Sequence, residues 1–272
     1  MSRLPFQSVV ALLVLMLASA AWADGSPVVF TAHDYGFNGP ERIPAGVTTM
    51  QIVNRGQDLH QIQILKFLHG KTAADFRAAM TAEPGRLPNW VKFVGGPNAI
   101  MPGAEAKATM PLSEGDYLLI CLIPNPQGTP HVALGMQRPL SVRGPKPVTV
   151  SLPKADVTIT QEDFRFGLSR PITAGTHTIR VTNHGAQPHE VVLVKLAPGA
   201  SAKDFAAAVE PRTSTSPPGA PIGGVVGIER GADAFLTAHF EPGHYGLICF
   251  FPDRETGAPH FTKGMALDFT VQ

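Results

Sequence analysis

The chain has few charged and few aromatic residues, and what it lacks narrows its possible partners. Of its 272 residues, 16% are charged, and the formal net charge is +1. It contains two Trp and three Tyr, and no basic tract interleaved with aromatic side chains. Because nucleic acid binding depends on concentrated Lys and Arg that neutralise phosphates, the sequence argues against nucleic acid as a partner.

Long apolar runs are absent except near the N-terminus. There Arg3 precedes an apolar run over residues 9–21, which is too short to span a bilayer comfortably, and Ala21-Trp22-Ala23 fits a small-x-small cleavage site. We predict that residues 1–23 are a cleaved signal peptide. The mature protein is then periplasmic or secreted, with no stable membrane insertion. The alternative is that this segment remains as a membrane anchor.

Motifs of common catalytic sites are also absent. The chain has no Gly-x-Ser-x-Gly elbow, no Walker loop and no His-Glu-x-x-His. It is rich in turn residues instead, with 27 Gly and 26 Pro among short apolar runs. This pattern is typical of an all-β fold built from sandwiches, and the length is sufficient for two domains of ordinary size.

The two halves of the chain repeat one another. Residues 30–37 align with residues 159–166 at an offset of 129, and residues 115–117 align with residues 243–245 at an offset of 128. A period this long indicates duplicated domains rather than a solenoid of short units.

The repeat predicts two domains, over residues 24–144 and 145–272, joined where Gly and Pro interrupt regular structure near residues 143–147. Each domain should contain one short helix, over residues 73–82 in the first and 202–209 in the second. A hydroxyl residue that can cap the helix precedes each of these Ala-rich segments, and an Asp stands three residues after it.

Each cysteine is followed by a histidine and a methionine, and another histidine stands sixty-odd residues upstream. The two sets are His60, Cys121, His131 and Met136, and His189, Cys249, His260 and Met265. A thiolate, two imidazoles and a thioether form a soft, mixed nitrogen and sulfur set, which copper favours. We therefore predict that these eight residues bind up to two copper ions, one in each domain.

In an exported protein, two cysteines can also form a disulfide. That bond would join equivalent strand ends of two separate domains, with Cα atoms within about 7 Å, so copper binding is the favoured interpretation. Strand alternation places His60 on the same face as Ile62 and Ile64, and Cys121 on the same face as Leu119. The ligands are therefore expected to point into the core.

These two sets make the chain resemble the cupredoxins, the blue-copper family that includes plastocyanins and azurins. In that family one His lies on a strand, and the Cys, the second His and the Met lie on a loop before the last strand. The resemblance implies two tandem cupredoxin-like Greek-key β-sandwiches, each with a short helix. It also implies type 1-like copper sites with Cys and two His near a plane and Met on the axis.

Two differences between the sets bear on the properties of the two predicted copper sites. Glu190 follows His189, whereas Gln61 occupies the equivalent place in the first half. The Glu190 carboxylate can orient the His189 imidazole. Alternatively, it is solvated on the opposite face of the strand, and we favour this second interpretation. Phe250 and Phe251 add apolar bulk beside the second Cys, which predicts unequal reduction potentials, although core packing would explain them equally well.

Three functions fit these features: electron transfer, which we favour, copper sequestration or delivery, and a structural double sandwich that has lost its metal. The expected partner is a redox protein or a copper donor or acceptor. Copper nitrite reductases and multicopper oxidases place a His directly before the type 1 Cys. Ile120 and Ile248 stand there instead, and the chain has no His-x-His pair. We therefore predict that the chain is not an enzyme.

Overall fold

The computed structural model describes residues 26–272, apart from residues 84–86, 146–149 and 210–215. The predicted signal peptide lies outside the described residues, as does part of the predicted linker. Within the described ranges, none of the helices combines the length and the apolar character needed to cross a membrane.

The first half forms a two-layer β-sandwich. Its strands are β1 (Val28–His33), β2 (Gly36–Asn38), β3 (Arg42–Asn54), β4 (Gln63–Phe67), β5 (Val91–Gly95), β6 (Glu105–Leu112), β7 (Gly115–Ile120) and β8 (Gln137–Pro145). One layer contains β2, β1, β3 and β6, and the other contains β8, β7, β4 and β5. The long strand β3 closes one side of the sandwich, because its first residues pair with β8 and its later ones with β1 and β6.

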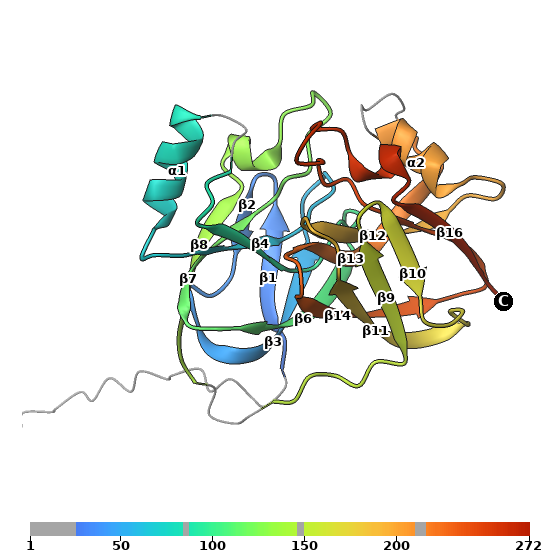
Figure 1. Ribbon diagram of the computed structural model, residues 1–272, viewed down its shortest axis with the longest axis horizontal. Coiled ribbons are helices and arrows are strands. Elements are labelled where there is room, and N and C mark those ends of the chain that lie inside the picture. The colour runs from blue at the N-terminus through green and yellow to red at the C-terminus, as the bar shows by residue number, and fades with distance from the viewer. Residues whose placement is uncertain (1–25, 84–86, 146–149, 210–215) are drawn as a thin grey trace, which may run out of the picture.

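The second half repeats this arrangement. Its strands are β9 (Val157–Glu162), β10 (Arg165–Leu168), β11 (Gly175–Asn183), β12 (His189–Leu196), β13 (Gly219–Ile228), β14 (Asp233–Phe240), β15 (Gly243–Ile248) and β16 (Ala266–Val271). The layers are β10-β9-β11-β14 and β13-β12-β15-β16. The predicted all-β fold, with two sandwiches that each have a short helix, is confirmed (Figure 1).

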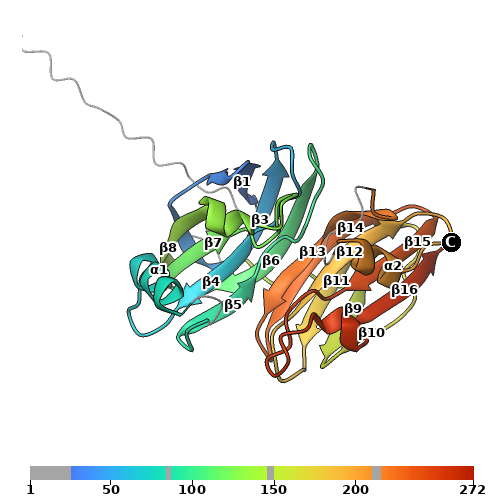
Figure 2. The same ribbon diagram turned by 90° about the horizontal axis from the view of Figure 1, so that it is seen from above.

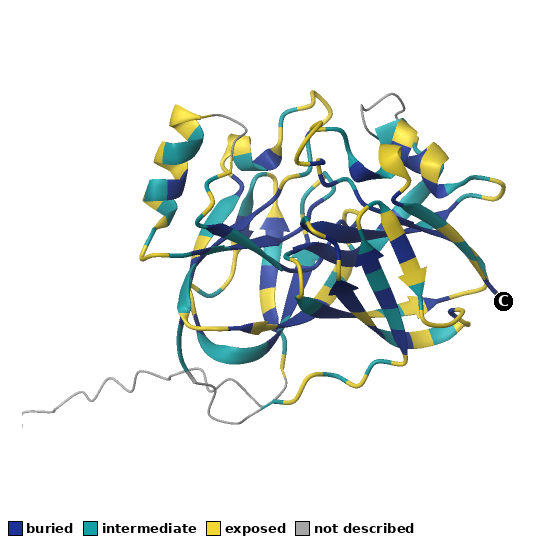
Figure 3. Ribbon diagram, viewed as in Figure 1, coloured by how far each residue is buried: buried dark blue, intermediate teal, exposed yellow. Residues whose placement is uncertain are grey.

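The two halves lie side by side (Figure 2), and each layer of the first half pairs with a layer of the second. Strand β6 pairs with β14 through Ala108 and Leu236, and β5 pairs with β13 through Val94 and Ile228. One cluster of buried apolar residues runs through both halves, so the hydrophobic core is continuous across the interface (Figure 3). The equivalent strands β5 and β13 face one another, as do β6 and β14, which gives the interface a pseudo-twofold character.

Each half carries one short helix on its outer face, with the predicted bounds: α1 (Ala73–Ala82) and α2 (Ala202–Val209). Thr72 and Asp75 form a reciprocal capping box at the start of α1, and Ser201 and Asp204 make the same contacts at α2. Phe76 of α1 packs in a cluster on the outer face of the first half.

Thr72→Ala should destabilise the protein by ~1 kcal/mol, because the substitution removes the side-chain oxygen that accepts from the Asp75 N–H. Chemical denaturation measures the loss. The copper-binding properties predicted for the chain should stay unchanged, since α1 contacts the outer face of the sandwich. A change in those properties would show that the helix supports the ligand residues.

Candidate metal centres

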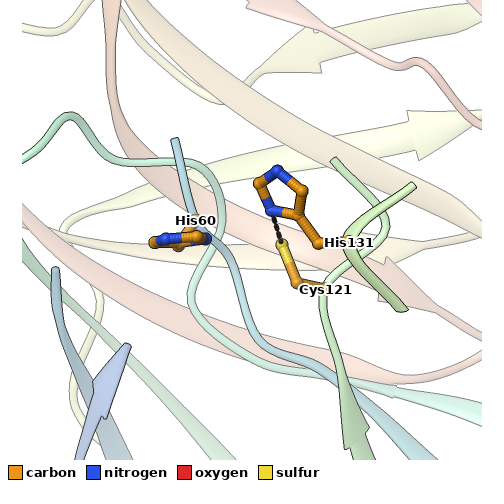
Figure 4. A group of neighbouring side chains, drawn as sticks. All are labelled: His60, Cys121 and His131. Atoms are coloured by element: carbon orange, nitrogen blue, oxygen red, sulfur yellow. Dashed lines mark hydrogen bonds between the residues drawn. The ribbon is translucent and has the colours of Figure 1, made fainter. Parts of the chain in front are cut away.

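The first half brings three predicted ligands together in its interior. His60 lies just before β4 and forms a bridge with Ile100, Cys121 directly follows β7, and His131 begins the short helix η1 (His131–Leu134). All three ligands are 0% exposed. Their ligand atoms lie within 4.8 Å of one another, and Cys121 Sγ is 3.5 Å from His131 Nδ1 (Figure 4).

The second half contains the same cluster. His189 begins β12, Cys249 follows β15 and His260 begins η2 (His260–Lys263), and all three are 0% exposed. Cys249 Sγ is 3.4 Å from His260 Nδ1, and the Nδ1 atoms of His189 and His260 are 2.9 Å apart. The structure thus brings both predicted His–Cys–His sets together. Both cysteines are free, so the alternative of a disulfide between them does not hold.

The two methionines are held beside these clusters by main-chain hydrogen bonds. In the first half, the Cys121 N–H donates to the Met136 carbonyl over 3.2 Å, and the Met136 N–H donates to the His131 carbonyl over 2.9 Å. The corresponding bonds join Cys249, His260 and Met265. Both methionines are 0% exposed. Their axial role in metal binding remains a prediction.

The donor atoms of the clusters suit a metal ion such as copper. His60 Nδ1 is buried and has no hydrogen-bond partner among the described residues, which is a costly arrangement unless its lone pair binds something. For metal–nitrogen and metal–sulfur bonds of about 2.0 and 2.3 Å in a trigonal plane, donor atoms lie roughly 3.5–3.8 Å apart. The sulfur–nitrogen distances of 3.5 and 3.4 Å are close to this range. The pair His189 and His260 must separate slightly to reach it.

Burial sets the protonation states of the metal-free clusters. It raises the pKa of Cys121 to about 12, although the N–H groups of Gln61 and Ile123 partly offset the effect. It also lowers the pKa of His60 and His189. These two imidazoles are therefore neutral and ready to bind a metal at neutral pH. The thiol is protonated, so metal binding would displace its proton.

Comparisons with known proteins find similar solved structures at low sequence identity. No protein-family model matches the chain, and no curated protein matches it in sequence. A structure of reduced auracyanin from Roseiflexus castenholzii is similar to one half, with 21% identity over 44% of this chain and 99% of that one and a TM-score of 0.30.

Two further similar structures span both halves of the chain. A multicopper oxidase is 16% identical over 90% of this chain and 88% of that one, with a TM-score of 0.26. A copper-containing nitrite reductase from Thermus scotoductus is 13% identical over 90% of this chain and 61% of that one, with a TM-score of 0.25. The prediction that the chain is not an enzyme is therefore corrected. Enzymes are among the proteins similar to it, so the absence of a His-x-His pair does not establish a non-catalytic role.

Each half also places a carboxylate beside its first histidine, and neither carboxylate was predicted from the sequence. His60 Nε2 lies 2.6 Å from Asp34 Oδ1, and His189 Nε2 lies 2.9 Å from Asp163 Oδ1. Burial alone would raise the pKa of Asp34, but the hydrogen bonds from the Gln57 N–H and from His60 outweigh it and keep the pKa below its ordinary value. An ionised carboxylate accepts a hydrogen bond from the Nε2–H group, which leaves the Nδ1 lone pair free to bind a metal.

A sequence signal for these carboxylates exists in the repeat. Asp34 and Asp163 occupy equivalent positions in the aligned segments, each followed directly by an aromatic residue. The two aromatic rings also contact the sites, since Tyr35 lies 4.6 Å from the His131 ring and Phe164 lies 5.2 Å from the His260 ring. The turn after β1 and the turn after β9 therefore cover both histidines of their sites.

The expectation that Glu190 is solvated is wrong. Glu190 lies on the opposite face of β12 from the core, as strand alternation requires, but only 6% of it is exposed, and Asn98 of the first half donates a hydrogen bond to its carboxyl group. Burial raises the pKa of Glu190 to about 7, and hydrogen bonds from Asn98 and from the Phe250 N–H partly offset the effect.

With copper bound as predicted, Asp34→Asn should raise the reduction potential of the first cluster's copper ion and weaken its copper(II) binding by ~10–100-fold. The substitution keeps an acceptor near His60 but removes the negative charge that favours copper(II). Asp163→Asn should do the same at the second site only, as measured by redox titration and competition with a chelator. Asp156→Asn is the matched control, because Asp156 also bonds a buried histidine, His177, at 2.6 Å, away from both clusters. If Asp156→Asn changed the reduction potential and the copper(II) affinity equally, Asp34 and Asp163 would not have the specific role at the copper sites that we assign to them.

Proposed function

We propose that this protein is an exported copper protein that carries electrons through two type 1-like sites. The observation that supports the proposal is the pair of buried His–Cys–His clusters, each with a methionine bonded to its ligand loop. Copper bound to such a set supplies a one-electron couple between Cu(I) and Cu(II). The electron is exchanged with a redox partner protein, and the export follows from the predicted signal peptide.

The ligand loops are stiffened by their prolines. In each ligand loop two prolines form a bridge across the loop, Pro124 with Pro130 and Pro252 with Pro259. Proline fixes φ, so these loops resist rearrangement. Ligands that keep their positions in both oxidation states lower the barrier to electron exchange.

Burial of the ligands favours electron transfer over copper delivery. The cysteine and both histidines of each cluster are 0% exposed, and a donor or acceptor protein would need direct access to them to exchange copper. An electron needs only close approach to the surface near the site. The covered clusters therefore support a resident copper ion.

Copper titration of the folded mature protein tests the proposal. The expected result is binding of two copper ions per chain, with intense visible absorption and a copper(II) EPR signal that disappear on reduction and return on oxidation. Electron self-exchange should be fast, and loss of Cu(I) to an apo acceptor protein should be slow. Failure to bind copper would overturn the proposal, and rapid Cu(I) transfer with slow self-exchange would instead support copper handling.

A further inference from the structure

A side chain of the first half is buried within the second half. Asn98 lies between β5 and β6 and is 0% exposed. Its Nδ2 donates to Glu190 Oε2 over 3.1 Å, to the Val191 carbonyl over 3.0 Å and to the Val225 carbonyl over 3.3 Å. All three acceptors belong to the second half, so the other sandwich satisfies the NH2 of this amide, while its Oδ1 accepts from the Ala99 N–H of its own half over 2.8 Å.

The acceptor Glu190 in turn contacts the second metal cluster. Its Oε1 accepts from the Phe250 N–H over 3.0 Å, and its own N–H donates to Cys249 Sγ over 3.4 Å. The carboxyl group therefore links Asn98 of the first half to the peptide bond that follows the cysteine. The chain of contacts runs from Asn98 through Glu190 to Cys249.

The hydrogen bonds of this bridge need the amide of Asn98 and the carboxyl group of Glu190. Two N–H donors, from Asn98 and from Phe250, point at the two oxygens of Glu190. A glutamine at this position would offer one acceptor and place its own NH2 against one of the donors. An apolar residue at position 98 would leave a buried carboxyl oxygen without its donor, which is costly.

Among the described residues, the first site has no equivalent bridge from the second half. Gln61 takes the place of Glu190. The main-chain contacts of the pseudo-twofold interface show that Val226 takes the place of Asn98, because Asn98 N–H donates to the Gly224 carbonyl and Val226 N–H donates to the Gly96 carbonyl. Valine has no side-chain donor. The bridge therefore acts in one direction, from the first half to the second site.

We infer that Asn98 of the first half is a positioning residue for the second copper site and acts through Glu190 on Cys249. Glu190 holds the peptide after Cys249 and the hydrogen bond to its sulfur, and Asn98 holds Glu190. This inference rests on the proposed function, and it predicts that a substitution in the first half alters the copper site of the second half more than that of its own.

The test uses Asn98→Leu and Glu190→Gln in the full chain. Glu190→Gln preserves the side-chain shape and covers the case in which Asn98→Leu does not fold. Gln63→Leu is the matched control: Gln63 is also fully buried in the first half and donates across the interface, but to the Gly227 carbonyl over 3.1 Å rather than to Glu190. A Cys121→Ser background isolates the absorption and EPR spectra of the second site.

Two readouts are measured. In the copper-loaded protein, Asn98→Leu and Glu190→Gln should shift the visible band and the copper hyperfine splitting of the second site. In the copper-free protein with both cysteines present, labelling of Cys249 by a small maleimide should accelerate about tenfold while labelling of Cys121 stays constant, because the peptide beside Cys249 has lost its anchor. Gln63→Leu should produce no such selective change.

The outcomes separate the inference from the proposed function. If the wild-type protein binds no copper, the proposed function fails, and the labelling rates still test the positioning role. If the wild-type protein binds two copper ions but both variants leave the second-site spectrum and Cys249 labelling unchanged, the inference alone is overturned. Equal changes at Cys121 and Cys249 overturn it as well, because they indicate general destabilisation.

Discussion

Cys121→Ser is expected to remove about half of the intense visible absorption of the copper-loaded protein and to leave the other half unchanged. The thiolate-to-copper charge transfer that gives this absorption needs the sulfur, and a serine hydroxyl does not replace it. Cys249→Ser should remove the complementary half. Titration with copper, followed by absorption and EPR spectra, measures both effects.

The independence of the two losses follows from the structure. Each cysteine is 0% exposed and its sulfur lies within hydrogen-bonding distance of the histidine on its own loop, 3.5 Å in the first cluster and 3.4 Å in the second. The double variant should lose the whole band. If either single variant abolishes all of the absorption, the two sulfurs share one site and the assignment of two separate centres is wrong.

The features that depend on neighbouring residues could be predicted from the sequence. Both helices begin and end where the Ala-rich segments and their caps indicate, because the contacts of Thr72 and Asp75 are local. Strand alternation correctly placed the cysteines inward, since Tyr117 and Leu119 share the core cluster of Cys121. Because the two halves repeat one another, the same reasoning predicted the helix bounds and the inward-facing cysteine of the second half.

Features that depend on pairing between distant segments could not be predicted. Nothing in the periodicity of β5 or β13 shows that these strands pair across the two halves. For the same reason, alternation identified the face of β12 that Glu190 occupies but not that Asn98 of the first half contacts its carboxyl group there. Asp34 lies 26 residues before His60 and reaches it only because the turn after β1 folds over the cluster.

Gly224→Ala should destabilise the protein by roughly 3–5 kcal/mol, the sum of a strained backbone conformation and a steric clash. Gly224 has φ +127°, a conformation that residues with a side chain rarely adopt, and a Cβ atom would lie 2.0 Å from the Val191 carbonyl oxygen. The chain cannot relieve this clash without moving β13 away from β12, which carries His189 and Glu190. Gly96→Ala should have a matching effect in the first half, where φ is +132° and the Cβ would lie 2.1 Å from the Ile62 carbonyl oxygen.

Gly103→Ala separates the two contributions to this loss. Gly103 also has a positive φ, +79°, but an added Cβ would meet no atom of the described residues within 4 Å beyond its chain neighbours, so only the backbone strain of about 1–2 kcal/mol should appear. Chemical denaturation of the three variants gives the free energies of unfolding, and copper titration reports on the sites. Gly224→Ala should weaken copper binding at the second site because His189 begins the displaced strand. If Gly224→Ala lowered the free energy of unfolding no more than Gly103→Ala does, β12 and β13 could separate without cost. The close contact between these strands would then not hold His189 in place.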